Sequence, residues 1–394
     1  MNNIANFDFK NKRTLIRVDF NVPLTEDNKV TDNSRIIAAI PTIKKVISTG
    51  GIAILISHLG RPKGKKTSKY SLSNIQKDLE KLLLQPVAFL DDCIGSKVES
   101  FINKQTAGSV IVLENLRFYN EEEIGDISFA KKLANLADVY INDAFGTAHR
   151  QHASNSVITQ FFKTKFFGLL MQDEIFNLDK AIKNPTKPFT AIIGGAKISG
   201  KIEIILSLIE KVDNLIIGGG MAYTFVKARG GAIGKSIYEK DKLELADRII
   251  QKAQDRGVNI ILPTDSVNSS KFGEDGAIQT SDIEKISPNY MGLDIGPKSI
   301  QLFKNVIQNS KTIIWNGPMG VFEMDLFSKG TEQIALSVSK ATSNGAYSLV
   351  GGGDSVSAIK KFNLENNVSY ISTGGGAMIE YLEGKKLPAI EAML

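Results

Sequence analysis

The sequence predicts an α/β protein of two domains, each a doubly wound fold around a parallel sheet. The chain has 394 residues, more than one hydrophobic core usually organises, so two domains of roughly 150–200 residues are expected. Short apolar runs alternate with longer amphipathic stretches along the whole chain, which is the pattern of parallel strands joined by helices. Apolar residues make up 42% of the chain, which is enough to fill two cores.

The predicted elements follow that alternation in order. In the first half, we expect strands at 14–20, 52–57, 87–90, 109–113 and 138–142, with helices at 34–48 and 71–84. In the second half, we expect strands at 189–193, 214–217, 259–262, 312–315, 346–350 and 370–372. Each is a short apolar run bounded by turn residues, as parallel strands usually are.

Residues 169–186 separate the two halves and predict a connecting helix that serves as a hinge. Apolar residues recur there at helical spacing, at Leu170, Ile175, Leu178 and Ile182. Two prolines follow and mark a domain boundary. The expected domains are therefore residues 1–168 and 187–376. The last residues, 377–394, are expected to form a tail that packs back on the first domain.

The charge of the chain leaves two classes of partner open. The formal net charge is +6, which fits a nucleic-acid-binding protein or an enzyme of small anionic substrates. A surface for single-stranded nucleic acid needs clustered cations interleaved with aromatic residues. Here the lysines are spread along the chain and the aromatic residues lie mostly in apolar runs. We therefore predict anionic substrates and no nucleic-acid partner.

No stretch of the sequence predicts a membrane span or a secretory signal. The longest apolar stretches, such as 52–56 and 110–113, are far shorter than the roughly 20 residues of a membrane helix. Residues 1–12 lack the apolar block and cleavage site of a secretory signal. The single cysteine, Cys93, cannot form an internal disulfide. We therefore expect a cytoplasmic protein with no membrane partner.

Polar residues follow four predicted strands of the first half at the point where each strand ends. The motifs are RVDFNVP at 17–23, SHLGRP at 57–62, ENLRF at 114–118 and NDAFGTAHR at 142–150. In an open parallel sheet that edge binds ligands, and arginine matches carboxylate and phosphate oxygens. A lone His58 would usually be structural and a lone Arg117 a surface ion pair, but four such strand ends predict a site for a small, multiply charged anion.

Glycine follows the predicted strands of the second half instead. The motifs are GGAK at 194–197, GGG at 218–220, NGPMG at 316–320, GGGD at 351–354 and GGG at 374–376. Glycine lets the backbone approach a ligand closely, and N–H groups at a helix start bind phosphate oxygens. Any one glycine pair could be a simple tight turn. Five at successive strand ends predict a nucleotide-binding domain.

Charged residues in these glycine loops have the positions that a metal-bound nucleotide requires. Lys197 and Lys201 lie four residues apart at the start of a predicted helix, 197–210, so both are expected to face the same phosphates. Asp354 suits Mg²⁺, which prefers one or two carboxylates together with phosphate oxygens. The alternatives are a solvated lysine pair and an aspartate that caps a helix.

Two familiar nucleotide motifs are absent. The segment GGAIGKS at 230–236 has one residue too few for a Walker loop and follows a helical pattern, whereas a Walker loop follows a strand. The segment beginning at Gly218 has Tyr223 where a dinucleotide fold needs its third glycine. The sequence therefore supports neither a P-loop kinase nor a standard dinucleotide-dependent dehydrogenase.

In their order, spacing and residue identities, these motifs together resemble those of the phosphoglycerate kinase family. The resemblance covers essentially the whole chain, in the segments 17–23, 57–62, 114–118, 143–150, 194–201, 315–323, 351–355 and 372–376. It implies two Rossmann-like domains facing each other across a cleft, the first binding 3-phosphoglycerate and the second a magnesium nucleotide. The sequence departs from the family at Gly200, where aspartate is frequent.

The resemblance also implies residue roles in the first domain. Asp19 and Asn21 would contact the glycerate hydroxyl and carboxylate, inside a basic patch around the triose. The implied substrate-binding set is Asp19, Asn21, Arg35, His58, Leu59, Gly60, Arg61, Arg117 and Arg150. The implied catalytic set is Arg35 and Lys197, both on the transferring group, and Gly375, at a helix start facing the transition state.

For the second domain, the resemblance implies a nucleotide-binding set of Lys201, Asn316, Glu323, Gly352, Gly353, Asp354 and Ser355, with Asp354 on Mg²⁺. The implied reaction is reversible, direct in-line transfer of a phosphoryl group from 1,3-bisphosphoglycerate to ADP in glycolysis, after domain closure. It gives 3-phosphoglycerate and ATP, and the enzyme would be a monomer. A related kinase acting on another carboxylate acceptor is the alternative.

Overall fold

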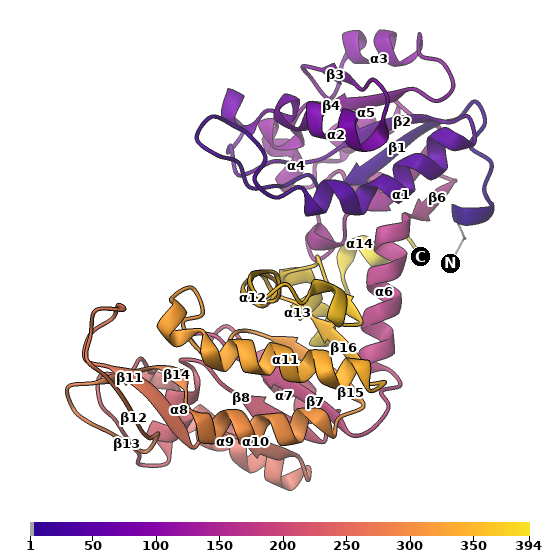
Figure 1. Ribbon diagram of the computed structural model, residues 1–394. Helices are drawn as coiled ribbons and strands as arrows, with labels where there is room; N and C mark the ends of the chain where they lie inside the picture. Colours follow the sequence, from indigo (N-terminus) through magenta and orange to yellow (C-terminus); the bar gives the residue numbers. More distant parts are fainter. Residues whose placement is uncertain (1–3) are drawn as a thin grey trace. The chain divides into compact units, whose positions relative to one another are not determined.

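The computed structural model describes residues 4–394, and its chain forms two compact α/β units (Figure 1). One unit comprises Met1–Ile175 and Lys386–Leu394, and the other comprises Phe176–Lys385. The division falls within helix α6 (Leu169–Ile182). The expected tail of 377–394 is split, since only its last nine residues belong to the first unit. There the Ala389 N–H donates to the Ala148 carbonyl at 3.0 Å.

The first unit contains a six-stranded parallel sheet of order β3-β4-β2-β1-β5-β6. Its strands are β1 (Arg13–Val18), β2 (Ile52–Ile56), β3 (Ala88–Leu90), β4 (Val110–Leu113), β5 (Val139–Asp143) and β6 (Lys165–Phe167). Its helices are α1 (Ser34–Ser48), α2 (Gln76–Leu83), α3 (Ser96–Ile102), α4 (Asn120–Glu123), α5 (Ile127–Ala134) and, near the C-terminus, α14 (Pro388–Glu391). The strand order reverses between β1 and β5.

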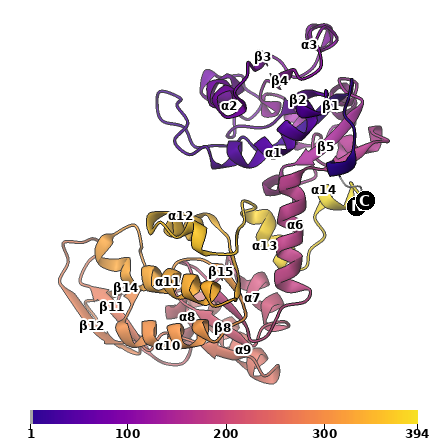
Figure 2. The ribbon, with the colours of Figure 1, turned by 45° about the vertical axis from the view of Figure 1, so that its right-hand side comes forward.

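The second unit contains a six-stranded parallel sheet of order β10-β8-β7-β15-β16-β17. Its strands are β7 (Phe189–Ile193), β8 (Asn214–Ile217), β10 (Asn259–Ile261), β15 (Thr312–Asn316), β16 (Tyr347–Val350) and β17 (Tyr370–Ile371). Its helices are α7 (Ile202–Ile209), α8 (Ala222–Ala228), α9 (Leu243–Asp255), α10 (Pro297–Gln308), α11 (Lys329–Ser343), α12 (Gly353–Lys361) and α13 (Gly376–Leu382). Both views show α10 and α11 side by side (Figure 1 and Figure 2). The strand order of this sheet reverses between β7 and β15.

The two parallel sheets confirm the predicted fold class, and the apolar strands form their cores. Phe9, Phe20 and Ile43 belong to the buried cluster of the first unit, and Phe303 and Trp315 to that of the second. Parallel strands buried on both faces read as continuous apolar runs, which is why the sequence shows them clearly.

Two parts of the second unit differ from the predicted elements. Strands β11 (Asp265–Ser269), β12 (Ile278–Asp282) and β14 (Met291–Ile295) form an antiparallel sheet that was not predicted, and the short β9 (Ala232–Ile233) and β13 (Lys285–Ile286) pair in parallel. The helix predicted at 197–210 begins only at Ile202, so its predicted start was wrong. Before it, the Lys201 N–H donates to the Ile198 carbonyl at 2.8 Å and closes a turn through Gly200.

Across residues 4–394, no helix combines the length and the apolar character that a bilayer crossing requires.

Candidate active site

In the first unit, the loops that carry the predicted anion site begin at one edge of the sheet. The strand register pairs Arg17 with Ile56 of β2 and Val18 with Asp143 of β5. The loops that follow β1, β2 and β5 therefore leave the sheet side by side, where the strand order reverses. In doubly wound sheets that crevice is the ligand-binding position.

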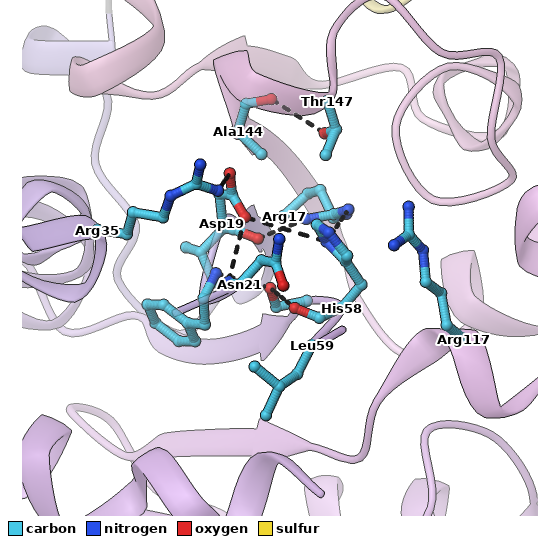
Figure 3. A network of polar contacts seen from close by, with 12 residues as sticks. Arg17, Asp19, Asn21, Arg35, His58, Leu59, Arg117, Ala144 and Thr147 are labelled. Carbon is cyan, nitrogen blue, oxygen red and sulfur yellow. Dashed lines mark hydrogen bonds and ion pairs between the residues drawn. The ribbon is translucent and has the colours of Figure 1, made fainter. Parts of the chain in front are cut away.

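Asp19 lies at the centre of this edge and makes an ion pair with Arg35 of α1 (Figure 3). One of its carboxylate oxygens, Oδ1, accepts from the Asn21 N–H at 3.2 Å and lies 4.0 Å from His58 Nδ1. The Asp19 side chain is almost entirely buried, whereas about a third of the Arg35 side chain is exposed. Arg35 thus reaches from the carboxylate toward solvent.

The loop after β2 is held to its neighbours through its backbone. The Gly60 N–H donates to Asn21 Oδ1 at 2.9 Å, and Arg117 Nη1 donates to the Gly60 carbonyl at 2.8 Å. Gly60 has φ of +64°, and a Cβ there would lie 2.3 Å from the Tyr70 ring. Only glycine fits this turn, and its N–H and its carbonyl hold Asn21 and Arg117, respectively.

The basic residues around His58 differ in exposure. Arg117 is nearly buried, and burial lowers the pKa of its guanidinium, with Arg17 and Arg150 acting in the same direction and Glu123 opposing them. Arg150 is exposed, as is Arg61, which hydrogen-bonds to none of the residues described in the structure. The Leu59 side chain is buried, and its carbonyl accepts from Asn115 Nδ2 at 2.7 Å.

In the second unit, the glycine loops also gather at the reversal of strand order. Ile193 at the end of β7 pairs with Ile217 of β8 and with Asn316 of β15. A Cβ on Gly194 would lie 2.1 Å from the Pro318 carbonyl oxygen, so the loops after β7 and β15 touch through their backbones. A larger residue at this position would push them apart.

A cavity of about 400 Å³ opens beside these loops. Three charged residues line it, Lys235, Glu323 and Asp354, and the remaining lining is largely apolar or glycine. The other lining residues are Gly195, Ala196, Gly219, Gly220, Tyr223, Ile237, Phe272, Met291, Gly292, Leu293, Pro318, Met319, Gly320 and Val321. Apolar walls with a few charged groups are typical of small-molecule sites.

Lys201, which precedes α7, donates to Asn316 Oδ1 at the end of β15. Burial lowers the pKa of Lys201, and the negative charge of Asp354 opposes that shift. Asn316 is fully buried, and its Nδ2 donates to the Gly351 carbonyl at 2.8 Å. Ser355 accepts the Gly317 N–H at 2.6 Å. The loops that follow strands β15 and β16 are thus joined through polar side chains. Asp354 is exposed at the start of α12.

Comparison with known proteins identifies the family to which the chain belongs. The family model described as phosphoglycerate kinase matches residues 4–385. The phosphoglycerate kinase of Chloroherpeton thalassium is 50% identical over 390 residues, which cover 99% of this chain and 98% of that one. That of Thermosynechococcus vestitus is 52% identical over 386 residues, 98% of this chain and 96% of that one. The chain belongs to the phosphoglycerate kinase family.

A solved phosphoglycerate kinase agrees with this assignment. The structure from Coxiella burnetii matches with a TM-score of 0.90 and 40% identity, covering 99% of this chain and 97% of that one. As a phosphoglycerate kinase, the protein is a glycolytic transferase that binds ATP and moves a phosphoryl group to or from a carboxyl acceptor. The predicted family and reaction are confirmed.

The predicted site residues fall into two groups. Hydrogen bonds or ion pairs connect Asp19, Asn21, Arg35, His58, Gly60 and Arg117 in the first unit. In the second, Lys201, Asn316 and Ser355 join the loops beside Asp354. Lys197 is exposed in the loop after β7, and because α7 starts at Ile202, the two lysines do not share a helix face as predicted. Gly375 precedes α13 with φ of +51°.

Sequence reasoning missed the apolar part of the cavity in the second unit. Tyr223, Ile237, Phe272 and Met291 line it, yet no polar motif marks them. Phe272 is 65% exposed although it is large and apolar. A large apolar residue in the otherwise charged and glycine-containing segment 271–276 was the one available signal.

The environment of Asp294 should make stability depend on pH in an unusual direction. Its carboxylate accepts from the Gly330 N–H at 2.6 Å and the Ile295 N–H at 2.8 Å, yet burial raises its pKa to about 7. An unfolded aspartate has a pKa of about 3.9. Between these values the folded state holds a proton that the unfolded state releases, so this group's contribution to stability is present at low pH and lost as pH rises through 7.

Asp294→Asn, which cannot titrate, should therefore change less in stability than the parent protein between pH 7.5 and 5. The expected difference in the free energy of unfolding is roughly 2.5 kcal/mol, from about two pH units of linkage. Urea unfolding at both pH values measures it, with the exposed Asp247→Asn as control. Equal pH dependence in Asp294→Asn and the parent would contradict the raised pKa.

Proposed function

We propose that the carboxyl edge of the first sheet binds 3-phosphoglycerate or 1,3-bisphosphoglycerate, and that of the second sheet binds magnesium ATP or ADP. One observation carries the assignment: guanidinium groups surround the first edge, whereas backbone amides of glycine loops line the second. Guanidinium groups match carboxylate and phosphate oxygens, and helix starts with free amides bind phosphate.

At the triose site, the proposed binding residues are Asp19, Asn21, Arg35, His58, Leu59, Gly60, Arg61, Arg117 and Arg150. Asp19, which can only accept, binds the glycerate hydroxyl, and Asn21 contacts the hydroxyl and the carboxylate. Leu59 and Gly60 act through their backbone, because the Leu59 side chain is buried. The side chains of Arg61 and Arg150 are exposed and make no hydrogen bond to the described residues that would keep them from an incoming anion.

At the nucleotide site, the proposed residues are Lys201, Asn316, Glu323, Gly352, Gly353, Asp354 and Ser355. Lys201 and the amides of 352–354 bind the phosphates, and Asn316 and Glu323 hold the ribose side of the nucleotide. Asn316 holds Lys201 in place through its buried amide.

Mg²⁺ fits this arrangement as part of the nucleotide. Within residues 4–394, no group of three or more histidine, cysteine, aspartate or glutamate residues could hold a metal. Mg²⁺ on a nucleotide needs only one or two carboxylates in addition to phosphates and water, and the exposed Asp354 at the start of α12 supplies one. When bound, the ion neutralises charge on the phosphates.

The proposed reaction is direct, in-line transfer. The carboxylate of 3-phosphoglycerate is ionised at neutral pH, so no general base is needed. Arg35, Lys197 and the helix start at Gly375 stabilise the charge on the transferring group, as phosphoryl transfer requires. Because triose and nucleotide bind to different domains, 1–168 and 187–376, the reaction needs closure about the hinge 169–186.

Asp354→Asn tests the metal assignment. Loss of one charged ligand, worth roughly 1.5–3 kcal/mol, should raise the KM for magnesium ATP about 10–100-fold. The KM for 3-phosphoglycerate should stay unchanged, and higher Mg²⁺ should partly restore activity. Coupled assays over a Mg²⁺ series measure this, with the exposed Asp247→Asn of α9 as matched control. An unchanged KM for magnesium ATP would exclude Asp354 as the ligand.

A kinase of another carboxylate acceptor is the alternative at the triose site. It would be favoured if 3-phosphoglycerate failed to support ATP turnover while a related acid did. We place the protein in the cytoplasm, where glycolytic substrates occur, and as a monomer, because one chain carries both half-sites.

A further inference from the structure

The guanidinium of Arg17 lies beside the His58 ring, and Arg17 is fully buried (Figure 3). It sits one residue before the end of β1 and contacts three groups. Its Nη2 lies 3.3 Å from His58 Nδ1, its Nε donates to Ser154 Oγ at 2.9 Å, and its Nη1 donates to the Val18 carbonyl. The motif RVDFNVP contains Arg17, but the proposed substrate contacts do not use it.

The contact between Arg17 and His58 determines where the proton of the imidazole lies. A guanidinium has only donors and stays charged in proteins, so Nδ1 of His58 must accept. In a neutral imidazole the other nitrogen, Nε2, then carries the hydrogen. Nε2 is the ring nitrogen that remains available to a ligand.

We propose that Arg17 is a positioning residue that fixes His58 as the neutral, Nε2-protonated tautomer. His58 then offers the anionic substrate one hydrogen-bond donor, while the charge comes from the surrounding arginines. This proposal rests on the assignment of His58 to the triose site. It adds the protonation state through which His58 acts.

The charged groups around His58 favour the neutral ring. Burial lowers its pKa well below the usual value, and nearby Arg17, Arg117, Arg35 and His152 act in the same direction. Asp19 is the acidic group that faces it, with Oδ1 at 4.0 Å from Nδ1. Asp19 is already paired with Arg35, so it does not offset the positive surroundings.

Glu122 and Ser154 hold Arg17 in this position. Ser154 Oγ, which accepts from Arg17, donates to Glu122 Oε1 at 2.6 Å, and the Ser154 N–H donates to Glu122 Oε2 at 3.0 Å. Glu122 is fully buried, and burial raises its pKa while the charge of Arg17 opposes that rise. A buried charge requires a counter-charge, and Glu122 supplies it to Arg17 through the serine hydroxyl.

Nitrogen-15 NMR of the full-length protein reads the tautomer directly. In the parent protein without substrate, we expect His58 Nδ1 to resonate as an unprotonated acceptor and Nε2 as protonated. This pattern should persist when the pH falls through about 6.5, where a free histidine titrates. A protonated Nδ1, or an imidazolium at neutral pH, would overturn the proposal.

Two variants test whether Arg17 causes the tautomer. Arg17→Met removes the donor, and Ser154→Ala, a milder change that keeps the chain folded if Arg17→Met does not, removes its anchor. Each should give His58 a mixture of tautomers and raise the KM for 3-phosphoglycerate several-fold, with the KM for magnesium ATP unchanged. The matched control is Ser48→Ala, an exposed serine of α1. An unaltered tautomer in the folded variants would refute the positioning role.

The same spectra separate this proposal from the substrate assignment. Addition of 3-phosphoglycerate should shift His58 Nε2 while Nδ1 remains an acceptor. If the tautomer is as stated but Nε2 does not respond to saturating 3-phosphoglycerate, the substrate assignment of His58 fails. The role of Arg17 would then be confined to the free protein, and its proposed catalytic consequence would be refuted.

Discussion

Replacing Arg35 with alanine is expected to lower kcat by roughly 10²–10³-fold, the usual loss when one preorganised donor to a transition state is removed. Arg35 is the partly exposed guanidinium of the triose edge that already pairs with Asp19. The variant should also raise the KM for 3-phosphoglycerate, because the Asp19 carboxylate is left unpaired beside an anionic substrate. The KM for magnesium ATP should not change. A coupled assay with 3-phosphoglycerate and magnesium ATP measures all three constants.

Two further variants make this result specific. Lys44→Ala removes an exposed cation from the same helix, α1, and should leave kcat unaffected. Arg35→Lys restores the charge without the planar fork and should recover only part of the loss. If Arg35→Ala retained most of the parent kcat, the role of Arg35 on the transferring phosphoryl group would have to be abandoned.

Replacing Lys197 with alanine is expected to reduce kcat by roughly 10²-fold, with modest changes in both KM values. Lys197 is exposed in the loop between β7 and α7, and none of the described residues forms an ion pair with it. A charge that binds the phosphoryl group more strongly in the transition state than in the ground state lowers kcat when it is removed. Pre-steady-state measurement of the chemical step tests this prediction.

The control for Lys197 is Lys240→Ala, an exposed lysine of the same unit outside the glycine loops. It should keep the parent kcat. A rise in the KM for magnesium ATP at constant kcat would show that Lys197 binds the nucleotide equally well in the ground state and in the transition state. Its catalytic assignment would then be wrong. Lys201 differs in this respect, because it is bonded to Asn316 and its pKa is lowered by burial.

The sequence predicted the parallel sheets well because their strands are buried on both faces. Strands β7 and β8 have the predicted bounds, and α1 spans the predicted residues 34–48. The antiparallel strand β12 was missed because it alternates exposed and half-exposed residues, with no apolar run. The start of α7 was misplaced because a turn at Gly200 interrupts a segment whose composition is otherwise helical.

The residues at the two sheet edges likewise divide into those that could be predicted and those that could not. Their motif residues could be predicted, because parallel strands place every carboxyl end, and therefore every polar loop, at one edge. The walls of the nucleotide-side cavity could not. Met291 lies in the antiparallel strand β14, and Phe272 lies in the loop between the antiparallel strands β11 and β12. Ordinary apolar residues such as these have no chemistry that marks them as ligand-binding in a sequence.

By itself, the sequence determined the fold class, the family and the charged or glycine-rich residues of both sheet edges, since these follow from periodicity and from motifs contiguous in the chain. Only the tertiary structure decided what those residues contact. Arg17 and Glu122 lie 105 positions apart, and they meet through Ser154 because folding buries all three. Burial removes water as a partner, so each buried charge must find its counter-charge across the fold, and no local pattern specifies which one.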